Sequence, residues 1–236
     1  MTNKIEVLVE KALQKALLSG SIPPATALRE GLLVDIFGIS REKIRKVLQR
    51  LGTQKLIELI PNKGAFVATP ALEQARSIYE ARRILEGGIV GHLAPNFDET
   101  QAKRLAQHLI NEDSALALGD RADSVALSAD FHLILAELTG NFLIQQQLQE
   151  LVAKTSLLVA VHEPIQCTHC ACEEHRDIFQ ALIQRDAVKA TKHMTAHLSM
   201  IETRLRPGMA NTGKGLDETL RKVWQELQCQ LLTECV

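Results

Sequence analysis

Aromatic residues and long apolar runs are scarce in this sequence. Phe, Trp and Tyr make up 3% of its 236 residues, whereas apolar residues overall make up 46%, with Leu and Ala the commonest. Cores packed from Leu and Ala favour helices, because a β-rich fold draws on Val, Thr and aromatic side chains. No apolar stretch is long enough to span a bilayer, and the first residues lack the apolar run of a signal peptide. We therefore expect a mainly helical cytoplasmic protein that does not enter a membrane.

Cysteine is also scarce and does not occur in pairs suited to a disulfide framework. There are five cysteines, an odd number, and no secretory signal accompanies them. Three of them stand close to a histidine, in the order Cys167, His169, Cys170 and Cys172. Such a cluster is an alternative zinc site, but the second half of a zinc-finger spacing is missing. We interpret residues 162–172 as a loop.

Charge is unevenly distributed along the chain, although the net charge is only −1. Residues 1–70 hold eleven Lys and Arg against six Asp and Glu, a net charge of +5. The remaining residues hold sixteen against twenty-two, a net charge of −6. A basic first segment on an acidic remainder indicates that one end of the protein binds a polyanion.

The first 70 residues show the order of elements of a winged helix-turn-helix. Apolar residues at helical spacing predict three helices, over residues 4–19, 28–37 and 40–51. Two β-like runs follow, at residues 56–60 and 65–68, and a turn separates them. Gly38 ends the second helix, and Ser40 is placed to cap the third. We expect a DNA-binding domain over residues 1–70.

The third helix and the hairpin carry residues suited to duplex DNA. A helix N-terminus with Arg side chains can contact phosphates and guanine edges in a major groove. The small, basic tip of the hairpin fits a minor groove, where glycine permits a close approach. The expected DNA-binding residues are Ser40, Arg41, Lys43, Arg45, Lys46, Lys63 and Gly64.

From residue 71 onward the pattern is helical throughout. Proline and glycine breaks predict helices that begin near residues 71, 98, 123, 141, 173 and 187. We expect these to form an all-α antiparallel bundle over residues 71–206. Residues 207–236 are expected to form a linker and one extra amphipathic helix, because apolar residues recur on one stripe from Leu216 to Leu231. This stripe needs a partner, either the bundle or a second protomer.

Two motifs of the first segment resemble those of GntR-type repressors. Residues 39–45, with the sequence ISREKIR, resemble the recognition helix of that family, and residues 61–67, PNKGAFV, resemble its wing. The resemblance covers the whole segment and implies that Arg41 and Arg45 contact DNA. The sequence departs from the family at Gly31, where these proteins often carry an Arg after the Glu that opens the second helix.

Five further motifs occur in the order seen in the FCD domain, the helical effector domain of the FadR subfamily of GntR regulators. They are Arg82 to Glu86, Phe131-His132, Gly140-Asn141, Glu174 to Arg176 and Ala196 to Leu198. In many relatives an Asp and three histidines bind a divalent metal. The resemblance implies a metal site of His132, His175 and His197, with Ser128 standing at the Asp position. Neutral imidazoles suit zinc or nickel.

The resemblance also implies an effector site beside these histidines. Arg82 matches the helix that lines the pocket in relatives, and a buried Arg suits a carboxylate through two parallel hydrogen bonds. Because Ser128 replaces an Asp ligand, the metal would keep open positions that an anion can fill. The expected effector-binding residues are Arg82, Ser128 and Asn141, and the expected effector is a small organic acid.

These observations predict a metabolite-responsive, DNA-binding transcription regulator and not an enzyme. We expect a homodimer that represses at a palindromic operator until its effector binds. One alternative is a metal-dependent hydrolase, because a three-histidine metal with open positions can activate water. Another is an architectural DNA binder, which would not need a cavity-forming body of this size. No acid–base partner is evident beside the histidines, since Glu174 and His175 are helix neighbours that point apart.

Overall fold

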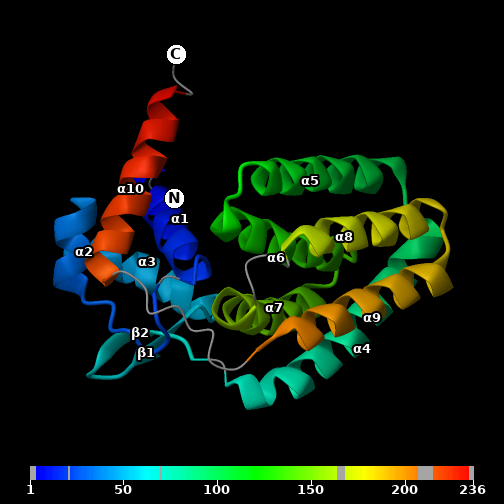
Figure 1. The fold of residues 1–236 in the computed structure, drawn as a ribbon, viewed down its shortest axis with the longest axis horizontal. Helices are drawn as coiled ribbons and strands as arrows, with labels where there is room; N and C mark the ends of the chain where they lie inside the picture. The colour runs from blue at the N-terminus through cyan, green and yellow to red at the C-terminus, as the bar shows by residue number, and fades with distance from the viewer. Residues whose placement is uncertain (1–3, 21, 70, 164–167, 207–214, 234–236) are drawn as a thin grey trace. The chain divides into compact units, whose positions relative to one another are not determined.

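The computed structural model describes residues 4–20, 22–69, 71–163, 168–206 and 215–233. The chain forms two compact units, Met1–Thr69 with Ala210–Val236 (unit 1) and Pro70–Met209 (unit 2). The fold is mainly α, and the described residues contain one two-stranded antiparallel sheet (Figure 1). None of the helices in the described ranges combines the length and the apolar character needed to cross a bilayer.

Unit 1 begins with three helices and a β-hairpin. The elements are α1 (Lys4–Leu18), α2 (Glu30–Phe37), α3 (Arg41–Thr53), β1 (Ile57–Ile60) and β2 (Gly64–Val67). The apolar stripes of the helices meet in a core that buries Leu13, Leu33 and Ile44 completely. β1 pairs with β2 in an antiparallel register that sets Ile57 opposite Val67. The winged helix-turn-helix expected from the sequence is confirmed.

Two residues set the turn between α2 and α3. Gly38 has φ 66°, a left-handed conformation that ends α2 and that a side chain would strain. Ser40 is extended, and its hydroxyl accepts a hydrogen bond from the backbone N–H of Lys43 at 3.4 Å. This cap fixes the start of α3 at the surface, with Arg41 as the first helical residue.

The last helix, α10 (Leu216–Thr233), packs against α1 and α2 of unit 1 (Figure 1). Its inward stripe includes Leu220 and Trp224, both buried. The Trp224 ring meets the Phe37 ring edge to face, with centroids 5.1 Å apart. The amphipathic helix expected from the sequence is present and packs on α1 and α2, a partner that we did not expect. Packing of this helix on a second protomer stays a prediction.

Unit 2 is a bundle of helices. Its elements are η1 (Leu72–Gln74), α4 (Ala75–Leu93), η2 (Ala94–Asn96), α5 (Glu99–Ala117), α6 (Arg121–Leu138), α7 (Phe142–His162), α8 (Thr168–Ile183) and α9 (Ala187–Arg204). Four of the helices begin at an Asp or Asn whose side chain accepts a backbone N–H, namely Asp98, Asp120, Asn141 and Asp186. Their apolar faces meet in one core around Tyr79, Phe131 and Leu148.

The loop expected at residues 162–172 is wrong in its second half. Helix α8 begins at Thr168 and so includes Cys170 and Cys172. No Pro or Gly occurs between Thr168 and Cys172, so nothing in the local sequence opposes a helix there. Cys167 lies outside the described residues.

Candidate functional site

Three histidines from three helices of unit 2 converge on one point. His132 lies on α6, His175 on α8 and His197 on α9, and all three side chains are buried. The Nε2 atom of His197 is 3.2 Å from Nε2 of His175 and 3.3 Å from Nε2 of His132. Phe131 stacks on the His175 ring with centroids 3.9 Å apart, which holds that ring in its plane.

A glutamate stands behind each histidine, on the Nδ1 side. Glu86 Oε2 lies 2.5 Å from His132 Nδ1. Glu112 Oε2 lies 2.9 Å from His175 Nδ1, and Glu174 Oε2 lies 2.7 Å from His197 Nδ1. Glu112 and Glu174 are within hydrogen-bond geometry and accept, which assigns the ring proton of His175 and of His197 to Nδ1 and leaves their Nε2 atoms with a lone pair. The close approach of the Glu86 carboxylate favours the same tautomer of His132. Each imidazole is oriented in the way that histidine ligands of metals are oriented.

Burial sets the protonation of this cluster. It lowers the pKa of His132 to about 4, and burial together with the other two imidazoles lowers the pKa of His197 well below its usual value. Burial alone would raise the pKa of Glu86, but Arg82 and His132 bring it down to about 2. For Glu112, the nearby His175 and His108 likewise outweigh burial and lower the pKa to about 2. The imidazoles of His132 and His197 are therefore neutral, and the carboxylates of Glu86 and Glu112 are ionised.

This arrangement fits a divalent cation. Because the protons are on Nδ1, the three Nε2 atoms face one another with lone pairs and no hydrogen between them. At 3.2 to 3.3 Å such lone pairs repel, and a cation bound to all three would turn the repulsion into attraction. Histidine nitrogens with carboxylates behind them are a typical donor set for zinc and nickel.

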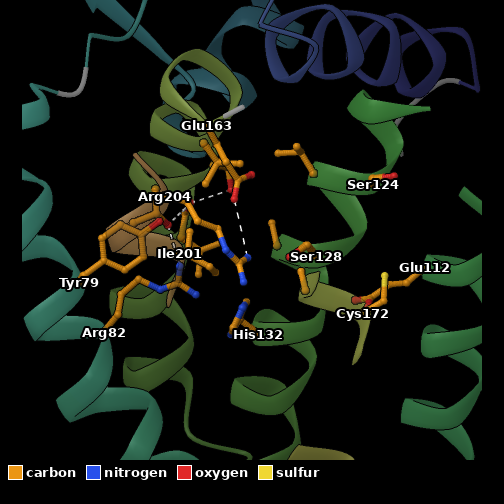
Figure 2. A pocket seen from close by; sticks show the side chains of 17 residues that line it. Tyr79, Arg82, Glu112, Ser124, Ser128, His132, Glu163, Cys172, Ile201 and Arg204 are labelled. Carbon is orange, nitrogen blue, oxygen red and sulfur yellow. Dashed lines mark hydrogen bonds and ion pairs between the residues drawn. The ribbon is translucent and has the colours of Figure 1, made fainter. Parts of the chain in front are cut away.

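A cavity opens beside His132 and is lined by polar side chains (Figure 2). Arg82 donates from Nε to Glu86 at 2.6 Å and from Nη1 to the Thr155 hydroxyl at 2.8 Å. Its Nη2 is buried without a hydrogen-bond partner among the described residues, as is the Tyr79 hydroxyl. Buried donors without a partner are costly, so the cavity is suited to a ligand that supplies acceptor oxygens.

A second guanidinium, that of Arg204 at the end of α9, also lines the cavity. It donates to Glu174 Oε1 at 2.7 Å and lies 3.9 Å from Glu163 Oε1. Figure 2 shows Tyr79 and Arg82 on one side of the cavity with Ser128 across from them. Glu112 and Glu163 also line the cavity, so the feature that suits an acceptor oxygen is the unpaired Nη2 of Arg82 and not an excess of positive charge.

The residues expected to bind an effector are not all brought together. Arg82 and Ser128 line the cavity, and Ser128 stands one helical turn before His132. Asn141 does not line it. Its exposed side chain accepts hydrogen bonds from the backbone N–H groups of Leu143 and Ile144 and caps α7.

The residues expected to bind DNA lie on the surface of unit 1. Arg41, Arg45 and Lys46 are exposed on α3, and Lys43 is half-buried. Lys63 and Gly64 lie at the tip of the hairpin and are exposed. A groove between α3 and the hairpin is lined by Arg45, Lys63 and Gly64, among others.

Sequence reasoning did not find the three glutamates or Arg204. Glu86 belongs to a motif that was noted, four residues after Arg82, and this spacing puts both on one face of α4. Glu174 was set aside because it adjoins His175, but it pairs with His197 on the neighbouring helix. Glu112 and Arg204 carry no local signal, because they meet their partners only through the packing of the bundle.

Comparisons with known proteins match each of the two units to a protein family. Residues 7–67 match the family model "Bacterial regulatory proteins, gntR family", and residues 77–200, more than half of the chain, match the model of the FCD domain. Among curated proteins, the HTH-type transcriptional repressor RspR of Escherichia coli is 24% identical over 206 residues, which cover 87% of this chain and 90% of that protein. The Uxu operon regulator of Haemophilus influenzae is 28% identical over 72% of this chain and 69% of its own length.

Solved structures agree in fold. A GntR regulator from Rhodococcus sp. RHA1 has a TM-score of 0.70 at 22% identity and covers 85% of this chain and 97% of its own. McbR/YncC of Escherichia coli has a TM-score of 0.67 at 18% identity and covers 84% of this chain and 95% of its own.

Proposed function

The chain belongs to the bacterial regulatory proteins of the GntR family that carry an FCD domain, and from this premise we propose that it represses transcription until a small organic acid binds unit 2. It is a DNA-binding transcription regulator and not an enzyme. The relatives named above include a repressor, which supports repression as the mode of action. The alternative of a three-histidine hydrolase finds no support, because the family matches are to regulators.

Unit 1 binds the operator in this proposal. Arg41 and Arg45 contact base edges in the major groove, where an arginine pairs with guanine through two parallel hydrogen bonds. Ser40, Lys43 and Lys46 contact phosphates, and Lys63 and Gly64 enter the adjacent minor groove. Two protomers would bind the half-sites of a palindrome in the cytoplasm, where the DNA lies.

Unit 2 holds the effector in this proposal. His132, His175 and His197 would hold a zinc or nickel ion, which when bound supplies open positions for a ligand oxygen. Arg82 and Arg204 would bind the carboxylate of the effector, and Ser128 would line its other side. The observation that carries this proposal is the convergence of three Nε2 atoms at one point, with His132 lining the same cavity as Arg82, whose Nη2 is unpaired.

Calorimetric titration with Zn²⁺ and with Ni²⁺ tests the site. The wild-type protein, freed of metal by a chelator, should bind one ion per chain. His175→Ala should lose this binding, whereas His92→Ala, which removes an exposed histidine of α4, should keep it. Equal binding by wild type and His175→Ala would contradict the proposed site.

A further inference from the structure

One carboxylate of unit 1 faces both arginines that we propose to contact bases. Glu30 is the first residue of α2, and Arg41 and Arg45 lie one turn apart on α3. Glu30 Oε1 accepts a hydrogen bond from Arg45 Nε at 2.7 Å, and Glu30 Oε2 lies 3.6 Å from Arg41 Nε. The two oxygens of one side chain thus bridge the two helices of the helix-turn-helix.

Glu30 contacts both arginines at Nε, so the terminal NH₂ groups of their guanidinium groups remain available to contact bases. An arginine can read guanine with two parallel N–H groups directed at O6 and N7. Because Glu30 is approached by Nε in both cases, the terminal Nη1 and Nη2 groups of Arg41 and Arg45 remain available for such a pair. The carboxylate also offsets the repulsion between two like charges on adjacent turns.

The bridge from Glu30 to Arg41 and Arg45 contributes little to the stability of the fold. The Arg41 and Arg45 side chains are 64% and 62% exposed, and exposed ion pairs contribute little to folding. The negative charge of the Glu30 carboxylate also repels the phosphates of bound DNA, so the bridge is not explained by nonspecific attraction to DNA either. A long exposed arginine loses side-chain conformational entropy when it binds a base. A hydrogen bond or ion pair at Nε restricts the side chain before DNA binds, so less entropy is lost on binding.

We propose that Glu30 is a positioning residue for sequence reading: it holds Arg41 and Arg45 by their Nε atoms and so raises discrimination between the operator and other duplexes. This inference rests on the proposed function, because it requires DNA on α3. Glu30 would thus affect sequence specificity without contacting a base itself.

Binding to two duplexes tests this role. The first is the duplex that the wild-type full chain selects from a random-sequence pool, and the second is a scrambled version of it. Glu30→Gln should weaken binding to the selected duplex about tenfold, as expected when a bidentate base contact is loosened. Binding to the scrambled duplex should stay equal or become tighter, because a negative charge has been removed.

Two further variants separate positioning from charge. Glu30→Asp keeps the charge but is one methylene shorter, so it should also lose discrimination. Asp35→Asn removes a charge from the exposed side of the same helix and should keep the wild-type ratio of the two affinities. The inference is overturned if Glu30→Gln changes both affinities by the same factor, or if Glu30→Asp behaves as wild type.

Arg45→Ala distinguishes this failure from a failure of the proposed function. If the selection enriches no sequence, or if Arg45→Ala binds the selected duplex as tightly as wild type, sequence reading by α3 is itself wrong. If Arg45→Ala weakens binding and Glu30→Gln does not, only the positioning role is wrong. Thermal unfolding of each variant, measured alongside, should match wild type, because the bridge is exposed.

Discussion

Single side chains decide whether the histidine cluster is a metal site. The carboxylate behind each imidazole fixes which nitrogen carries the proton, and that choice leaves Nε2 free to act as a ligand atom. Without the carboxylates the three rings could turn, or shift their protons, and hydrogen-bond to one another instead. The glutamates matter to the proposed site as much as the ligands do.

A first prediction concerns Glu112, which pairs with His175. Glu112→Gln keeps the shape of the side chain but removes its charge, so the metal affinity should fall by roughly 10- to 100-fold. Competition with a chromophoric chelator measures this affinity. Glu99→Gln, at the exposed start of the same helix, should leave it unchanged. Unaltered affinity in Glu112→Gln would show that the carboxylate does not tune His175.

A second prediction concerns Arg82. Arg82→Lys keeps a positive charge beside Glu86 but cannot hold Glu86 and Thr155 and also direct a separate N–H group into the cavity, as Nη2 does. We expect small mono- and dicarboxylates to raise the melting temperature of the wild type, and this rise should disappear in the variant. Arg83→Lys is the matched control, since Arg83 pairs with Glu202 and does not line the cavity. A full response in Arg82→Lys would remove Arg82 from the effector site.

At the scale of secondary-structure elements, the positions of most helices could be predicted from the sequence, but the surfaces against which they pack could not. The 3.6-residue spacing of apolar residues and the capping residues Asp98, Asn141 and Asp186 mark most helices in the sequence. The start of α8 was placed too late because a cysteine cluster after a proline suggested a loop. The apolar stripe of α10 indicated that it needs a partner, but a stripe does not identify the surface that covers it.

A third prediction concerns the packing of α10. Leu220 is fully buried between α10 and the first helices, so Leu220→Ala should destabilise unit 1 by about 2–5 kcal/mol. Trp224 is the only tryptophan of the chain and lies on Phe37, so its fluorescence during urea unfolding reports on this packing. Gln225→Ala, on the exposed side of α10, should unfold as wild type does. Unchanged unfolding of Leu220→Ala would mean that α10 adds nothing to unit 1.

At the scale of the whole molecule, the two proposed sites lie in separate compact units. The proposed DNA-binding residues and Trp224 belong to unit 1, and the histidines and their glutamates belong to unit 2. The charge asymmetry and the family motifs located both sites in the sequence. The motifs contain Glu86 and Glu174 but do not show which histidine each one faces, and Glu112 lies outside them, because these contacts form between helices that become adjacent only after folding.

A fourth prediction follows from this separation. Zn²⁺ at 100 times its dissociation constant should stabilise unit 2 by about 2.7 kcal/mol, because it binds the folded state alone. Thermal unfolding followed by circular dichroism should therefore shift upward, whereas the transition followed by Trp224 fluorescence should not move. A chelator should reverse the shift. Equal shifts of both signals would contradict independent unfolding of the two units.

The chain leaves unit 1 after Thr69 and returns to it at Ala210, so unit 2 is an insert within unit 1 and not an appendage to it. In a hybrid regulator, residues 70–209 would be replaced as one segment by the corresponding domain of a relative, which requires two junctions. A fusion made at one junction alone would give the DNA-binding module a foreign sensor and deprive it of α10, which covers Phe37.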